Sequence, residues 1–150
     1  MKILSHIKYL LIVGIVFVSM NAHSQKTLLT VISNQEGAPA DLKKSELKYI
    51  FLGEKERWSN GSRIKIALMK PGSISGKQMC KKIFDMSEDD FANYWEEQSF
   101  AGKLRKPAYF KNITDLQTYV SENPGAIGFI DQIPAISTIK VVLIDGKKSF

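Results

Sequence analysis

The sequence predicts an α/β fold with a mainly parallel sheet flanked by helices. Two observations support this prediction. Short apolar runs rich in β-branched residues recur along the chain, and stretches with a helical spacing of apolar residues lie between most of them. Helices placed between buried strands are typical of parallel sheets, because a crossover connection brings the next strand back in the same direction.

The amino terminus has the pattern of a secretory signal peptide. Lys2 and Lys8 precede an apolar run at residues 9–20, and the small residues Ala22 and Ser24 follow it. An uncleaved anchor is the alternative, but a run of 12 residues is shorter than the roughly 20 that a membrane-spanning helix needs. We therefore predict cleavage after Ser24, a mature domain at residues 25–150, and a periplasmic or secreted location.

The composition of residues 25–150 argues against most enzyme classes. Both histidines, His6 and His23, lie in the predicted signal peptide, and Cys80 is the single cysteine. Residues 25–150 therefore lack the histidines that most hydrolase mechanisms and zinc sites use, and a single cysteine excludes an intramolecular disulfide. We expect no catalytic residue, no metal site and no cofactor, and we interpret Cys80 as a helix-packing residue.

The charge of the predicted mature domain is mildly positive. Residues 1–24 contain two of the 21 basic residues and none of the 15 acidic ones, which leaves a net charge of +4. This excess favours anionic partners. The basic residues are scattered and no arginine-rich tract is interleaved with aromatics, so the sequence does not predict nucleic-acid binding.

Four segments are predicted to form strands, because each is short, apolar and rich in β-branched residues. They are residues 28–32, 64–68, 126–130 and 139–144. The last is nearly uninterrupted in its apolar character, as expected of a strand covered on both faces.

Four helices are predicted from apolar spacing and from start and stop signals. In the first, Leu47, Ile50 and Phe51 lie at i, i+3 and i+4, and Gly53 follows as a stop signal. The other three are expected at residues 75–84, after a cap at Ser87, and after a cap at Asn112.

The first candidate binding site is the loop at residues 71–77, between the end of a predicted strand and the start of a predicted helix. Gly72 would let backbone N–H groups approach a ligand closely, and Ser73 and Ser75 would add hydroxyl donors. Helix amino termini attract anions, and open α/β sheets place ligands at the carboxyl ends of strands. Glycine and serine are also what any helix start prefers, so the pattern alone does not establish a site.

Two further segments are candidates. A loop at residues 100–107 carries Lys103, Arg105 and Lys106, which could close over an anion or could form an ordinary solvated loop. The segment at residues 123–129 contains Gly125 and Gly128, whose absent side chains would allow either close approach to a ligand or tight packing of the chain.

Acidic and aromatic clusters are interpreted as structural. Glu88, Asp89 and Asp90 lie in the opening turn of a predicted helix, where acids stabilise the helix dipole, and we interpret them as solvated. Trp58 and Trp95 could form ligand platforms, but we expect them in the core.

Four motifs in order resemble the phosphate-binding proteins of ABC transporters. The segment I-F-L-G-E-K-E-R-W at residues 50–58 is similar to the family's I-[FY]-L-G-K-x-x-x-W segment, and P-G-S-I-S at 71–75 is similar to its D-G-S-G-T phosphate loop. P-G-A-I-G-F at 124–129 resembles its P-G-A-I-G-Y segment. The Tyr94-Trp95 pair followed by F-A-G-K at 100–103 resembles short relatives of the family.

This resemblance implies a fold like one lobe of a type II periplasmic binding protein, with phosphate as the ligand. It also implies that Ser73 matches the phosphate-binding serine, while Ile74 replaces a glycine and Ser75 a threonine. The arginine expected in the family falls at Met69. The adjacent Lys70 could substitute, although a lysine supplies a point charge and not a bidentate fork.

The combined hypothesis is an exported, non-enzymatic module that binds a small oxyanion, phosphate first among them, for ABC-type uptake or sensing. Its partners would be that oxyanion and an inner-membrane transporter. The alternative is an interaction module that binds an envelope protein and keeps the fold without a functional anion site. The expected anion-binding residues are Lys70, Gly72, Ser73, Ile74, Ser75, Lys103, Arg105 and Gly125.

Overall fold

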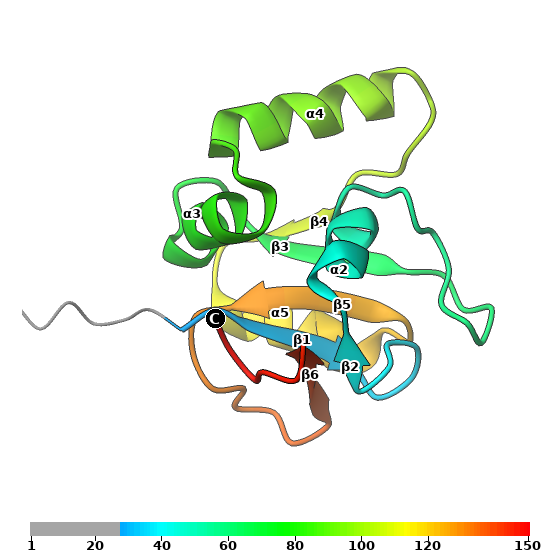
Figure 1. Ribbon diagram of the computed structural model, residues 1–150, viewed down its shortest axis with the longest axis vertical. Helices are drawn as coiled ribbons and strands as arrows, with labels where there is room; N and C mark the ends of the chain where they lie inside the picture. The colour runs from blue at the N-terminus through cyan, green and yellow to red at the C-terminus, as the bar shows by residue number, and fades with distance from the viewer. Residues whose placement is uncertain (1–27) are drawn as a thin grey trace, which may run out of the picture.

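The computed structural model describes residues 28–150, which form one six-stranded sheet with helices on both faces (Figure 1). The predicted signal peptide lies outside the described residues. The strand order is β2-β6-β1-β5-β3-β4. The strands are β1 (Thr30–Asn34), β2 (Asp41–Leu42), β3 (Lys65–Met69), β4 (Ala108–Phe110), β5 (Ala126–Ile130) and β6 (Ile139–Ile144).

The sheet is mainly parallel, as predicted, but its central strand β1 runs against all the others. β1 pairs antiparallel with β5 and with β6, whereas β3 pairs parallel with both β5 and β4, and β2 pairs parallel with β6. It follows that the other five strands share one direction. Their carboxyl ends therefore lie at one edge of the sheet and their amino ends at the opposite edge.

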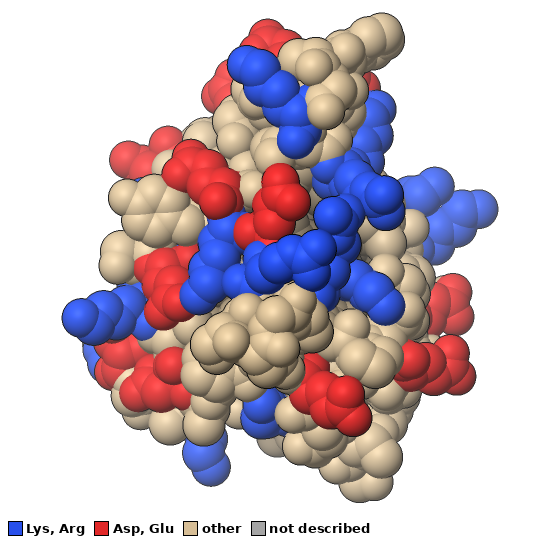
Figure 2. Space-filling model, turned by 90° about the vertical axis from the view of Figure 1, so that its right-hand side faces the viewer, with Lys and Arg blue, Asp and Glu red and all other residues tan. Residues whose placement is uncertain are grey.

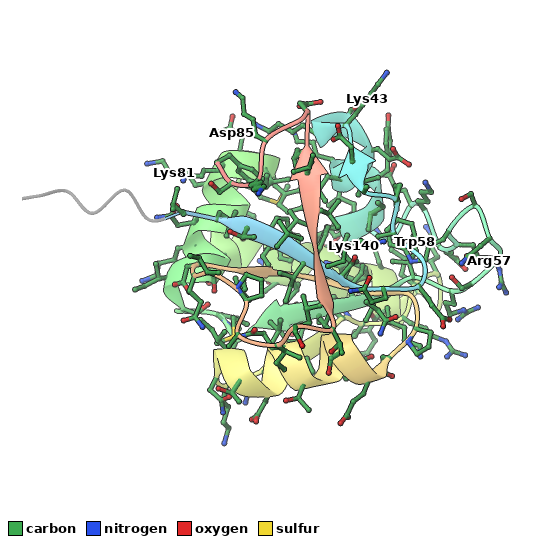
Figure 3. All side chains as sticks on the ribbon, turned by 90° about the horizontal axis from the view of Figure 1, so that it is seen from below. Lys43, Arg57, Trp58, Lys81, Asp85 and Lys140 are labelled. Carbon is green, nitrogen blue, oxygen red and sulfur yellow. The ribbon has the colours of Figure 1, made fainter. Side chains whose placement is uncertain are left out.

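The helices divide between the two faces of the sheet (Figures 1 and 3). One face is covered by α5 (Ile113–Glu122), whose Leu116 and Val120 pack on Ile32 and Ala67. The other face carries a larger core that includes residues of α2 (Lys44–Phe51), α3 (Ile74–Met79), the π-helix η1 (Cys80–Phe84) and α4 (Glu88–Phe100). None of the helices within residues 28–150 is long and apolar enough to cross a membrane.

The predicted helix starts at Ser87 and Asn112 are confirmed. The side chain of Ser87 accepts a hydrogen bond from the backbone N–H of Asp90, and the side chain of Asn112 accepts one from that of Asp115. The expected single helix at residues 75–84 is α3 followed by η1, which ends at Asp85 in the left-handed conformation, with a φ of 57°. The first strand begins two residues later than expected, and the short strands β2 and β4 were not predicted.

A hydrogen bond from a tryptophan side chain to a backbone carbonyl joins the loop after α2 to the start of β5. The indole Nε1 of Trp58 donates a hydrogen bond to the carbonyl oxygen of Gly125 over 2.9 Å, and Trp58 is 3% exposed. Figure 3 shows that Trp58 lies against the body of the fold, while the neighbouring Arg57 lies out on the loop. Gly125 has a φ of 81°, and a Cβ atom there would lie 2.3 Å from the carbonyl oxygen of Arg63. Two family-like motifs thus meet in this hydrogen bond, and the close approach of Arg63 requires glycine at position 125.

We expect Gly125→Ala to lower the free energy of unfolding by about 3 kcal/mol or more, because it adds a backbone clash to an unfavourable φ. Gly146→Ala is the matched control, since Gly146 has a φ of 76° and open space where its Cβ would lie. The control should cost about 1 kcal/mol. Urea denaturation measures both losses, and equal losses would contradict the packing role of Gly125.

Cys80 is a buried core residue, as expected, with 3% exposure. Burial, with a smaller contribution from the negative charge of Glu88, raises the pKa of the Cys80 thiol to about 11. Because the thiolate is the reactive form, the native thiol is chemically inert near neutral pH.

We expect Cys80 to react with a disulfide reagent at pH 8 many times more slowly in the folded protein than in urea, because about 0.1% of the native thiol is ionised. The pKa of this thiol is about 11 in the folded protein and 9.0 in the unfolded chain. Its contribution to the free energy of unfolding is therefore fully present below pH 9.0 and is lost as the pH rises through about 11. Equal labelling rates in the two states would contradict this interpretation.

Candidate functional site

The loop between β3 and α3 has the local geometry expected of a helix start at the carboxyl end of a strand. β3 ends at Met69, and the side chain of Ser73 caps α3 by accepting a hydrogen bond from the N–H of Gly76 at 3.0 Å. Ser75 is buried, whereas Ile74 is 60% exposed. The Ser73 hydroxyl oxygen is therefore already used as an acceptor, and its proton remains available for donation to a ligand.

A carboxylate of the protein itself lies over this loop. The backbone N–H of Gly72 donates to both oxygens of Glu88, at 3.0 and 3.3 Å. Gly76 leaves room for this arrangement, because a Cβ atom there would lie 2.8 Å from the Oε1 of Glu88 and 2.8 Å from the Oγ of Ser73. One backbone N–H of the loop is thus hydrogen-bonded to a carboxylate, and that carboxylate belongs to the first residue of α4.

Glu88 makes a contact that the sequence did not indicate. We expected Glu88, Asp89 and Asp90 to be solvated acids of the helix start. Asp89 is exposed, and Asp90 accepts a hydrogen bond from the hydroxyl of Ser87. Glu88 is partly buried and contacts a loop 16 residues earlier in the chain. This contact has no local sequence signal, because it depends on how α4 packs beside α3.

The other expected cations lie elsewhere in the fold. Lys103 and Arg105 line a pocket together with Ile64 and Ile66, which lie at the start of β3. Gly72 and Ser73 follow the opposite end of β3, a strand of five residues that spans about 13 Å. The structure therefore does not bring Lys103 and Arg105 to the Ser73 loop. Lys70, which is exposed, is the expected cation that stays adjacent to it.

Gly125 also lies at the amino edge of the sheet. The N–H of Lys65, the first residue of β3, donates to the carbonyl oxygen of Gly125 at 3.2 Å. The N–H of Gly125 donates to the carbonyl oxygen of Glu36 at 2.9 Å. Both backbone polar groups of Gly125 thus have protein partners, and its position is explained by packing.

The described residues offer little other machinery for chemistry. Within residues 28–150 there is no group of three or more His, Cys, Asp or Glu side chains that could hold a metal ion. Burial raises the pKa of Tyr109, with smaller contributions from Cys80 and Glu96, so its hydroxyl stays protonated near neutral pH. Trp58 and Trp95 are both core residues, as expected, with exposures of 3% and 2%.

Comparisons with known proteins agree on the fold. No family model and no curated protein sequence matches the chain. Among solved structures, an ABC-type phosphate transport receptor from Vibrio cholerae matches with a TM-score of 0.61 and 14% identity, over 82% of this chain and 48% of its own. A phosphate-binding protein from Stenotrophomonas maltophilia matches with a TM-score of 0.61 and 18% identity, over 80% of this chain and 39% of its own.

A third match is a Clostridium perfringens protein, provisionally assigned as a phosphate ABC transporter substrate-binding protein, whose structure contains bound phosphate. It has a TM-score of 0.61 and 17% identity, over 81% of this chain and 46% of its own. The chain therefore spans less than half the length of each of these proteins, which are binding proteins and not enzymes by their descriptions. The resemblance suggested by the four sequence motifs is confirmed at the level of the fold: residues 28–150 have the α/β fold that occupies somewhat under half of a phosphate-binding protein of ABC transporters.

Proposed function

We propose that this protein is an exported solute-binding-like module that binds a small oxyanion, phosphate first among them, at the loop of residues 70–75. One observation carries the proposal: the backbone N–H of Gly72 already holds a carboxylate at 3.0 Å, in the loop whose sequence resembles the family's phosphate loop. Uptake through an ABC-type inner-membrane transporter, or sensing, is the role that this binding would serve, in the periplasm.

An incoming oxyanion would replace the Glu88 carboxylate. It would accept from the N–H of Gly72 and from the hydroxyl of Ser73, and Lys70 would supply positive charge. Hydrogen bonds to an ionised acceptor are roughly twice as strong as neutral ones. Lys70 and Gly72 are both exposed, so water screens this site, and affinity should depend strongly on ionic strength. Ile74 and Ser75 would contribute through the turn of backbone that they form.

A second candidate function is supported by the same contact. Since Glu88 satisfies the loop from within, the fold needs no ligand to complete it, and the protein could serve as an interaction module for an envelope protein. Phe100, at the end of α4, is 91% exposed, more than any other large hydrophobic side chain within residues 28–150, and would be offered to such a partner. Two results together would favour this function. No oxyanion would bind to the protein or to the variants below, and an envelope protein that binds the unmodified protein would no longer bind after Phe100→Ala substitution.

Replacing Ser73 by Ala should weaken phosphate binding by about tenfold, because a hydroxyl donor to an ionised acceptor is lost. Calorimetric titration of the purified protein with phosphate, sulfate and molybdate at low ionic strength measures the effect. Ser73 also caps α3, so the variant should lose about 1 kcal/mol of stability, which urea denaturation controls. Unchanged affinity in a folded variant would contradict the role of Ser73.

Replacing Glu88 by Gln should tighten phosphate binding by about tenfold, because the competing negative charge is removed while the side-chain shape is kept. Asp89→Asn is the matched control. It removes the same charge one residue along α4, from an exposed side chain, and should change the affinity by no more than about twofold. If both variants bound alike, Glu88 would not be the competitor of the ligand.

A further inference from the structure

A positively charged surface lies at the amino edge of the sheet, away from the Ser73 loop. Figure 2 shows Lys and Arg side chains gathered across the middle of the face that carries the loops after α2 and α4, with acidic groups beside them. A pocket of about 290 Å³ opens among these loops and the start of β3. We call it the basic pocket. Its lining residues are Gly53, Lys55, Glu56, Arg63, Ile64, Ile66, Trp95, Gly102, Lys103, Leu104 and Arg105.

The charges of the basic pocket are unbalanced. Four of its lining residues are cations and one, Glu56, is an acid, so its lining carries a net charge of +3. Glu56 lies 4.0 Å from Arg63, and both side chains are more than 40% exposed, so this pair is weak. Lys55 pairs with Glu46, outside the pocket. Among the described residues, Lys103 and Arg105 have no carboxylate within 4 Å.

The pocket also has an apolar wall. Ile64, Ile66 and Leu104 lie beside the cations, and the indole of Trp95 completes the wall. Trp95 is 2% exposed, and its Nε1 has no hydrogen-bond partner among residues 28–150. The ring carbon of Trp95 that lies beside Leu104 and Gly53 belongs to the apolar part of the indole, so Trp95 contributes apolar surface to this wall. Cations without carboxylate partners beside apolar side chains are the arrangement expected of a site for an anion that carries an apolar group.

We infer that the basic pocket binds a small organic anion, in which a carboxylate or a phosphate or sulfate monoester is joined to an apolar group. The anionic end would contact Lys103 and Arg105, and the apolar end would pack on Ile66 and Leu104. The volume lies at the lower end of the range for ligand pockets, which limits the apolar group to about the size of one ring. An adjoining cavity of about 310 Å³, lined by Lys65, Lys106 and Tyr119 among others, shares Arg63 and Arg105 with it and leaves room for a longer ligand.

This site is independent of the proposed phosphate site, because none of its lining residues belongs to the loop of residues 70–76. It also differs in chemistry. The Ser73 loop offers backbone and hydroxyl donors, which suit a bare oxyanion. The basic pocket adds hydrocarbon, which favours an anion that carries an apolar group.

The two tryptophans of the chain provide a direct test. In ¹⁵N-labelled protein, the indole N–H groups of Trp58 and Trp95 give two resolved NMR signals, and the bond from Trp58 to Gly125 makes the first an internal reference. The purified protein is titrated with phenyl phosphate, with benzoate and with inorganic phosphate. Phenyl phosphate and benzoate should shift the Trp95 signal saturably and by more than the Trp58 signal. Inorganic phosphate should shift it at least about threefold less at equal concentration.

Charge-removing variants complete the experiment. Lys103→Gln and Arg105→Gln should each weaken phenyl phosphate binding by about threefold or more. Lys111→Gln is the matched control, an exposed lysine just beyond the carboxyl end of β4, and should leave the binding unchanged. Ser73→Ala should also leave it unchanged, which separates this inference from the proposed function. The inference would be overturned by a Trp95 signal that does not move, by equal shifts of both indoles, or by equal affinities in the Arg105 and Lys111 variants.

Discussion

The reversed strand β1 is the constraint on which the rest of the sheet depends. All five of its residues are buried, and it bonds to β5 on one side and to β6 on the other. β6 and β2 join the sheet only through it. Asn34 at its end donates two side-chain hydrogen bonds, of 3.0 and 2.9 Å, to the carbonyl oxygens of Val120 and Ser121. These bonds satisfy carbonyls at the end of α5 and fix that helix over its face of the sheet.

With β1 as the exception, all other strands point one way, and this polarity separates the Ser73 loop from the basic pocket. The Ser73 loop belongs to the carboxyl edge, where open α/β sheets place their ligands. The basic pocket belongs to the amino edge. The separation of about 13 Å along β3 exceeds the Debye length of about 8 Å at physiological ionic strength, so charges at one edge have little effect at the other. The two edges can therefore differ in ligand preference without mutual interference.

The helix starts could be predicted from the sequence, because they depend on residues that are close together in the chain. Ser87 and Asn112 mark their helix starts because a side chain and a backbone N–H three residues later are enough to form a cap. The existence of β2 and β4 could not be predicted, because strands of two and three residues form only when a partner strand is present. The direction of β1 could not be predicted either, because it depends on how β1 pairs with β5 and β6. The placement of Lys103 and Arg105 away from the Ser73 loop could not be predicted either. Sequence order does not say at which edge of a sheet a loop lies. The contact at the Ser73 loop joins Gly72 with Glu88, 16 positions apart, and the packing contact at the amino edge joins Trp58 with Gly125, 67 positions apart.

Glu88 determines how the Ser73 loop can respond to a ligand. Gly72 is exposed, so water could satisfy its N–H, and the loop does not require the carboxylate in order to fold. Under the proposed function, the carboxylate would instead be an internal competitor that an incoming anion displaces. Displacement would be easy, because Glu88 is the first residue of α4, and an acid in the first turn of a helix is stabilised by the helix dipole whether it faces the loop or the solvent. A phosphate dianion gains more from the same donors than a carboxylate does. Under the proposed function, the loop would therefore prefer a phosphate dianion to a singly charged anion.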